Sequence, residues 1–161
     1  MANALSLYGF VMHRNLADES TPLETVYTTS NTTFRVGDPI RLTTTGLAVK
    51  STAASTKLGF IYGFAVEPIT AKAATSYPMK IVPALPHVVF RAACASTLNV
   101  TKGYVGRGAG IKVSGVYFGI AVGSPTLSQV QIIGLASGSS YGTYAEMLCI
   151  VKHSAFIGQI T

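Results

Sequence analysis

The chain has 161 residues, of which 48% are hydrophobic and only 11% are charged, and it contains 16 glycines and no tryptophan. A typical soluble domain carries about 25% charged residues, so this chain must be either inserted in a membrane or extensively buried against other protein chains. No stretch reaches the roughly 18 uninterrupted apolar residues that a spanning helix requires. The length fits one domain with a single sizeable core. We therefore expect a subunit of an oligomer or larger assembly, with no membrane contact.

The formal net charge is +6, and it is unevenly placed along the chain. Acidic residues gather near the front, whereas residues 68–145 contain no acid and six basic residues: Lys72, Lys80, Arg91, Lys102, Arg107 and Lys112. Such a segment is positive in any fold and favours an acidic partner. The basic residues stand singly, without the clusters or interleaved aromatic residues typical of strand-stacking sites, which argues against nucleic-acid binding.

The first twenty residues show no clear periodicity, so we expect an extended N-terminal arm over residues 1–20 and a single β domain over 21–161. No basic segment precedes the apolar residues of the N-terminus, which does not fit a signal peptide. Cys94 and Cys149 both lie in apolar, strand-like surroundings. Buried free thiols are the favoured interpretation, and a disulfide between them is the alternative.

After a plausible strand over 26–34, turn chemistry becomes clear. Val36-Gly37-Asp38-Pro39 predicts a tight turn, because glycine supplies a positive φ, aspartate caps its own turn and proline fixes the next φ. Residues 40–42 and 47–49 alternate in polarity around Gly46, which predicts a hairpin. A small-residue loop and an apolar strand over 58–66 follow.

The remaining chain predicts further strands. Residues 77–83 include two prolines, with a third at 86, and because proline cannot donate to a ladder we expect an edge strand or a very short one. Residues 88–94 predict a good strand, and 98–101 is a further candidate. A glycine-dense turn over 103–110 precedes strands at 111–113, 116–122, 129–133 and 147–151. Strands at roughly ten-residue spacing predict an all-β sandwich or barrel, with little or no helix because no segment has a 3.6-residue period.

Catalytic patterns are thin. Residues 138–142 match the G-x-S-x-G pattern, but a nucleophile elbow joins a strand to a helix, and these flanks predict strand, loop, strand. His13, His87 and His153 are isolated from one another and from acids, so neither a zinc site nor a proton relay is indicated. We expect no enzymatic activity, no cofactor and no metal.

The order F-x-V-G-D-P-I-x-L, G-L-A-V, A-A, L-G-F and G-F-A-V-E within residues 34–67 resembles the pattern of capsid decoration, or cement, proteins of tailed bacteriophages. A weaker echo lies at 108–122. The resemblance implies a small β-barrel or β-tulip, often a homotrimer, that binds the major capsid protein from outside. It therefore implies a virion structural protein that is made in the host cytoplasm and located on the capsid exterior.

On this reading the arm and the basic segment supply the capsid or subunit interface: Leu5, Leu7, Tyr8, Phe10, Val11, Arg14, Arg91 and Arg107. The alternative is a receptor- or carbohydrate-binding β domain of a phage tail or fibre, which needs exposed aromatic residues and acids in loops. Six tyrosines are candidates for such aromatic residues: Tyr8, Tyr77, Tyr104, Tyr117, Tyr141 and Tyr144. Acids near them in the sequence are scarce, and only Glu146 lies close to any of them. A tail-tube or major capsid subunit is a third reading, and the chain is short for the latter.

Overall fold

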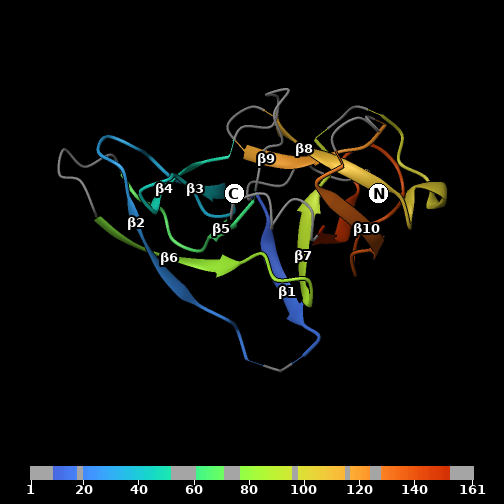
Figure 1. The fold of residues 1–161 in the computed structure, drawn as a ribbon. Helices are drawn as coiled ribbons and strands as arrows, with labels where there is room; N and C mark the ends of the chain where they lie inside the picture. Colours follow the sequence, from blue (N-terminus) through green and yellow to red (C-terminus); the bar gives the residue numbers. More distant parts are fainter. Residues whose placement is uncertain are drawn as a thin grey trace.

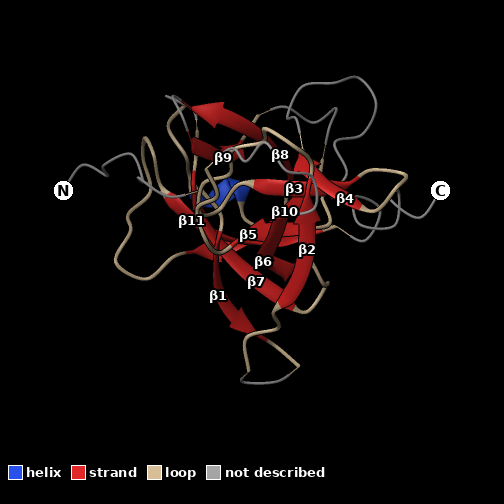
Figure 2. Cartoon of the chain, turned by 90° about the vertical axis from the view of Figure 1, so that its left-hand side faces the viewer, coloured by secondary structure: helices blue, strands red, loops and turns tan. Residues whose placement is uncertain are grey.

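The computed structural model describes residues 9–17, 20–51, 61–70, 77–95, 98–114, 117–123 and 128–152. Within these residues the secondary structure is β throughout, apart from the single 3-10 turn η1 (Lys102–Tyr104), blue in Figure 2. The expected all-β fold is confirmed. No helix in this part of the chain is long and apolar enough to cross a bilayer.

One half of the molecule is a closed five-stranded barrel with the strand order β2-β4-β3-β5-β6, seen on the left of Figure 1. Its strands are β2 (Glu24–Thr28), β3 (Pro39–Leu42), β4 (Leu47–Lys50), β5 (Gly63–Ala65) and β6 (Tyr77–Pro83). Antiparallel pairs join most neighbours, and the parallel pair of β2 with β4 together with the antiparallel pair of β2 with β6 closes the ring. The segment that carries the decoration-protein resemblance thus supplies β3, β4 and β5 of the barrel wall.

The predicted turn before β3 forms as its residues dictate. Gly37 has a φ of 83°, a conformation that costs little only for glycine. The amide of Asp38 donates to the carbonyl of Arg35 at 3.0 Å, and the Asp38 carboxylate accepts the amide of Arg35 at 2.8 Å. The same carboxylate lies 2.9 Å from Nζ of Lys50 on β4. Asp38 therefore fixes the turn and ties it to the neighbouring strand.

The predicted β3–β4 hairpin also forms, with Arg41 opposite Val49 and Leu42 opposite Ala48. Gly46 takes a φ of 78° in its turn, and the Thr43 hydroxyl accepts the amide of Leu47 at 3.0 Å. The local turn chemistry of this stretch is enough to specify the hairpin.

Strand β6 corrects one prediction, because it is seven residues long and pairs with β2 on one side and β5 on the other. The amide of Lys80 donates to the Glu67 carboxylate, on the side of β6 that faces β5. Because main-chain groups alternate along a strand, the nitrogen of Pro78 faces the same side. The pairing with β5 covers only residues 81–83, so no strand lies opposite this nitrogen. By the same alternation Pro83 directs its nitrogen toward β2, whose pairing ends at Ile81. Each proline nitrogen therefore faces a position where no neighbouring strand would accept a hydrogen bond. For this reason β6 can contain both prolines although it is paired on both sides.

The other half is a six-stranded sheet with the order β1-β7-β11-β10-β8-β9, on the right of Figure 1. Its strands are β1 (Val11–Asn15), β7 (Val88–Ala93), β8 (Gly108–Ser114), β9 (Tyr117–Ala121), β10 (Val130–Leu135) and β11 (Glu146–Val151). The sheet curls until β9 reaches the end of β7, where the amide of Ala95 donates to the carbonyl of Ile120 at 2.9 Å. The candidate strand at 98–101 is instead a single bridge between Val100 and Gly142.

Strand β5 joins the two halves through the alternation of its side chains. Ala65 packs inside the barrel with Val26, Ile40 and Met79. Phe64 points the other way, into the larger cluster that fills the curled sheet. Val82 of β6 belongs to the same larger cluster. The two sheets are therefore held together by shared apolar side chains.

Two expectations about the chain can be placed on this fold. Of the arm expected over residues 1–20, residues 1–8 lie outside the described residues, whereas Val11–Asn15 forms β1 and pairs with β7. Cys94 and Cys149 are buried free thiols. Cys149 lies opposite Phe90 on β7, not opposite Cys94, so the register does not pair the two cysteines.

Candidate functional site

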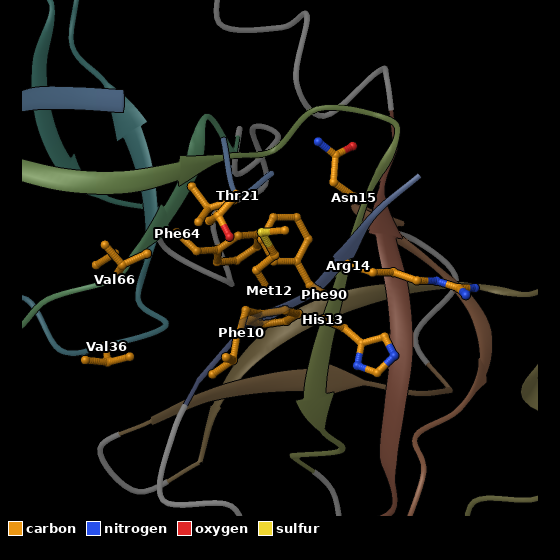
Figure 3. A pocket seen from close by; sticks show the side chains of 13 residues that line it. Phe10, Met12, His13, Arg14, Asn15, Thr21, Val36, Phe64, Val66 and Phe90 are labelled. Carbon is orange, nitrogen blue, oxygen red and sulfur yellow. The ribbon is translucent and has the colours of Figure 1, made fainter. Parts of the chain in front are cut away.

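A groove of about 510 Å³ separates β1 from the barrel. Its lining is mostly apolar, with a polar edge contributed by β1 and by Thr21. Figure 3 shows Phe10, Met12, Phe64 and Phe90 gathered in its centre, with Val36 and Val66 across from them and His13 and Arg14 directed away. Concave, largely apolar surfaces with a few polar groups are the usual form of a binding site.

The floor of the groove is a rigid aromatic cluster. Phe10 stacks on Phe64 with 4.6 Å between ring centroids and 21° between planes. Phe64 in turn meets Phe90 at 4.6 Å with a tilt of 57°. Each ring comes from a different part of the chain, so β1, the barrel and β7 converge here. The floor is thus preformed and resists collapse.

Strand β1 presents an unpaired edge to this groove. It is the first strand of its sheet, and within the described part of the chain β7 is its one partner strand. The amide of Phe10 donates to Gly37 on the barrel, so alternation directs the main chain of Met12 toward the groove. The pairing register of β1 with β7 shifts between Met12 and Arg14. The amide of Leu16 donates to the carbonyl of His87, on the β7 side. Because main-chain groups alternate along a strand, those of Asn15 face the opposite side, toward the groove. Within the described residues no main-chain hydrogen bond occupies the groove side of Met12 or Asn15, so this edge can donate to and accept from an added strand.

The four acidic residues that the structure describes are all engaged within the chain. Glu24 accepts the hydroxyl of Tyr62 at 2.6 Å, and burial, this hydrogen bond and the charge of Glu24 raise the pKa of Tyr62 to about 12. Asp38 is paired with Lys50, Glu67 accepts the amide of Lys80, and Glu146 pairs with Arg91.

Basic residues, in contrast, stand exposed on the surface. Six of them are exposed in the described part of the chain: Arg14, Arg41, Lys80, Lys102, Arg107 and Lys112. They occupy β1, β3, β6, β8 and the η1 region rather than a single patch. Because the described carboxylates are already bound internally, this surface presents mainly positive charge to a partner.

The structure separates the residues that we predicted for an interface. Leu5, Leu7 and Tyr8 lie outside the described residues. Phe10 is 1% exposed, because its ring stacks on Phe64 within the larger core cluster, so the side chain presents almost no surface to a partner. Val11 is 41% exposed and Arg14 is exposed; both border the groove, and the Arg14 side chain is directed away from its centre.

The two basic residues of the central segment lie elsewhere. Nε of Arg91 donates to Glu146 at 2.6 Å, so this guanidinium already has a carboxylate partner. Arg107 is exposed and stacks over Tyr104 at 5.7 Å from the ring centroid. Neither residue lines the groove. The sequence reasoning missed Val66 and the free edge of β1, because neither shows its position until residues far apart in the chain are brought together.

Other candidate chemistry finds no assembled site. The serine of the G-x-S-x-G pattern is Ser140, and it lies in the loop between strands β10 and β11, whereas a nucleophile elbow joins a strand to a helix. In the described part of the chain no three His, Cys, Asp or Glu side chains cluster as metal ligands would. Tyr27, Tyr77 and Tyr141 are exposed, as sugar binding requires, but the described carboxylates are bound to other groups of the chain.

Comparison of the chain with known protein families, with curated proteins and with solved structures gave no match. What the molecule can offer a partner is therefore defined by three features of its own. They are the rigid apolar groove, the free edge of β1 and the excess of exposed positive charge.

Proposed function

We propose that this protein is a virion structural protein of the capsid decoration type, which binds the outside of a tailed-bacteriophage major capsid lattice and stabilises the head. The proposal depends on one observation about charge. The described acidic residues form hydrogen bonds or ion pairs within the chain, whereas six described basic side chains are exposed to solvent. Such a surface complements an acidic one, and electrostatic complementarity favours association and correct register.

The fold supports the same proposal mechanically. A closed barrel has no edges, and its turns at Gly37 and Gly46 are fixed by local hydrogen bonds. A rigid subunit of this kind loses little conformational entropy when it binds. If the chain is a homotrimer, several modest contacts per particle add as avidity without any one of them being large.

The test combines oligomeric state and capsid binding. Light scattering after gel filtration is expected to give a trimer of the 16.8 kDa chain, about 50 kDa. Co-sedimentation with expanded empty capsids of the parent phage is expected to show binding at low salt that weakens markedly at high salt, because exposed charges are screened. A monomer that does not bind these capsids would contradict the proposal.

A glycan-array screen separates this function from the receptor-binding alternative. A decoration protein is expected to give no specific sugar ligand. A specific glycan that binds with the same affinity at low and high salt would favour the tail or fibre reading.

A further inference from the structure

The groove beside β1 has the features of a strand-addition site, and we propose that it binds an extended, acidic segment of a partner protein as an additional strand antiparallel or parallel to β1. This deepens the proposed function and rests on it for the identity of the partner, since a major capsid protein would supply the segment. The recognition itself depends only on groups of this chain.

The first support is the main chain of β1. Its five residues give roughly 16 Å of strand edge, of which one side pairs with β7. On the other side the peptide groups of Met12 and Asn15 face the groove, as the hydrogen bonds of Phe10 and Leu16 on either side establish. Main-chain hydrogen bonds to an incoming strand give affinity that depends little on its sequence.

The second support is the surface beneath that edge. An added strand directs alternate side chains to one face. The apolar surface open to them belongs to Val66, which is 38% exposed, and to the partly buried Met12 and Val36, because Phe64 and Phe90 beneath are only 1% and 0% exposed. Because the aromatic floor is already packed, binding would require no reordering of these side chains. Apolar side chains at alternate positions of the segment would be buried against Met12, Val36 and Val66.

The third support is charge, which selects the occupant. Arg14 and His13 are exposed on β1 beside the groove. Among the described residues the groove lining contains no carboxylate, and the described acids elsewhere are bound internally. An acidic segment is therefore attracted to this edge and a basic one is repelled.

The experiment measures binding of synthetic peptides to the isolated full chain. The probe is a short peptide with an alternating valine–threonine core and aspartates at both ends. Matched controls carry lysines in place of the aspartates, or N-methyl groups on alternate core residues, which remove main-chain donors and leave the side chains unchanged. Amide chemical shifts in ¹⁵N NMR spectra report the site, and titration gives the affinity.

We expect the acidic peptide to shift the amides of Met12, His13 and Asn15 and both control peptides to bind at least about tenfold more weakly. Arg14→Glu is expected to weaken binding about fivefold, whereas Lys112→Glu, the same charge change on β8 away from the groove, is expected to have a small effect. Equal binding of the N-methylated peptide, shifts confined to other surfaces, or no binding of the acidic peptide would overturn the inference.

The two proposals fail in distinguishable ways. A chain that binds capsids but shows no shifts at β1 with the acidic peptide retains the decoration function and loses the groove inference. A chain that binds the peptide at β1 but not the capsids retains the groove inference and loses its assignment to a capsid partner.

Discussion

Replacement of Phe10 by alanine is the sharpest test of how the groove is built. The ring is 1% exposed and lies 4.6 Å from that of Phe64, so the change removes a fully buried aromatic side chain between two sheets. Such truncations cost about 3–5 kcal/mol. For a chain of this length each kcal/mol lowers Tm by about 2–4 °C. We therefore expect Phe10→Ala to unfold about 12 °C below the wild type in a calorimetric or circular-dichroism melt.

The matched control is Val11→Ala on the same strand. This side chain is 41% exposed, so its truncation is expected to cost less than about 1 kcal/mol. If Phe10 were an exposed interface residue, as the sequence first indicated, its replacement would change stability by no more than about 0.5 kcal/mol. Equal melting of the two variants would refute the placement of Phe10 in the core and, with it, the preformed floor of the groove.

Three further outcomes are expected. Gly37→Ala should destabilise the fold strongly, because a Cβ at this position would lie 2.5 Å from the nitrogen of Phe10. Gly46→Ala should cost only about 1 kcal/mol, because nothing lies within 4 Å of a Cβ there. Equal urea unfolding midpoints for the two variants would contradict this difference. Asp38→Ala should cost about 2 kcal/mol in urea unfolding, since the amide of Arg35 loses its acceptor; wild-type stability would show that the carboxylate is dispensable. Burial raises the pKa of Cys94 to about 12 and raises that of Cys149 as well, so both thiols stay protonated at pH 8 and should react with Ellman's reagent only after denaturation; rapid reaction of the native protein would contradict their burial.

Local chemistry explains which parts of the fold the sequence could predict. The turn at Gly37 and the hairpin at Gly46 depend on neighbouring residues, so composition and spacing were sufficient there. Strand β6 was misjudged because the effect of a proline depends on the side to which its nitrogen points. That side is set by where β2 and β5 end, which no local pattern in residues 77–83 reveals.

The candidate site was less predictable, for a related reason. Phe10 follows an apolar run near the N-terminus and resembles an arm residue until Phe64 and Phe90 are placed against it. Arg91 was rightly identified as part of a basic segment, but its partner Glu146 lies on β11, which pairs with β7 only in the folded sheet. The excess of positive charge could be predicted from composition alone. The hydrogen bonds and ion pairs that engage the described carboxylates within the chain are visible only in the folded structure.

The pairing of β1 with β7 has a consequence for synthesis of the chain. Val11 pairs with Arg91, and the whole barrel segment from Glu24 to Pro83 is translated between them. At about 5–20 residues per second, β1 leaves the ribosome about 4–16 s before its partner strand is complete. The barrel can close during that interval, while the curled sheet cannot begin at its first strand. During that interval β1 has no strand to pair with, although Phe64 emerges before β7 and can already cover the Phe10 ring.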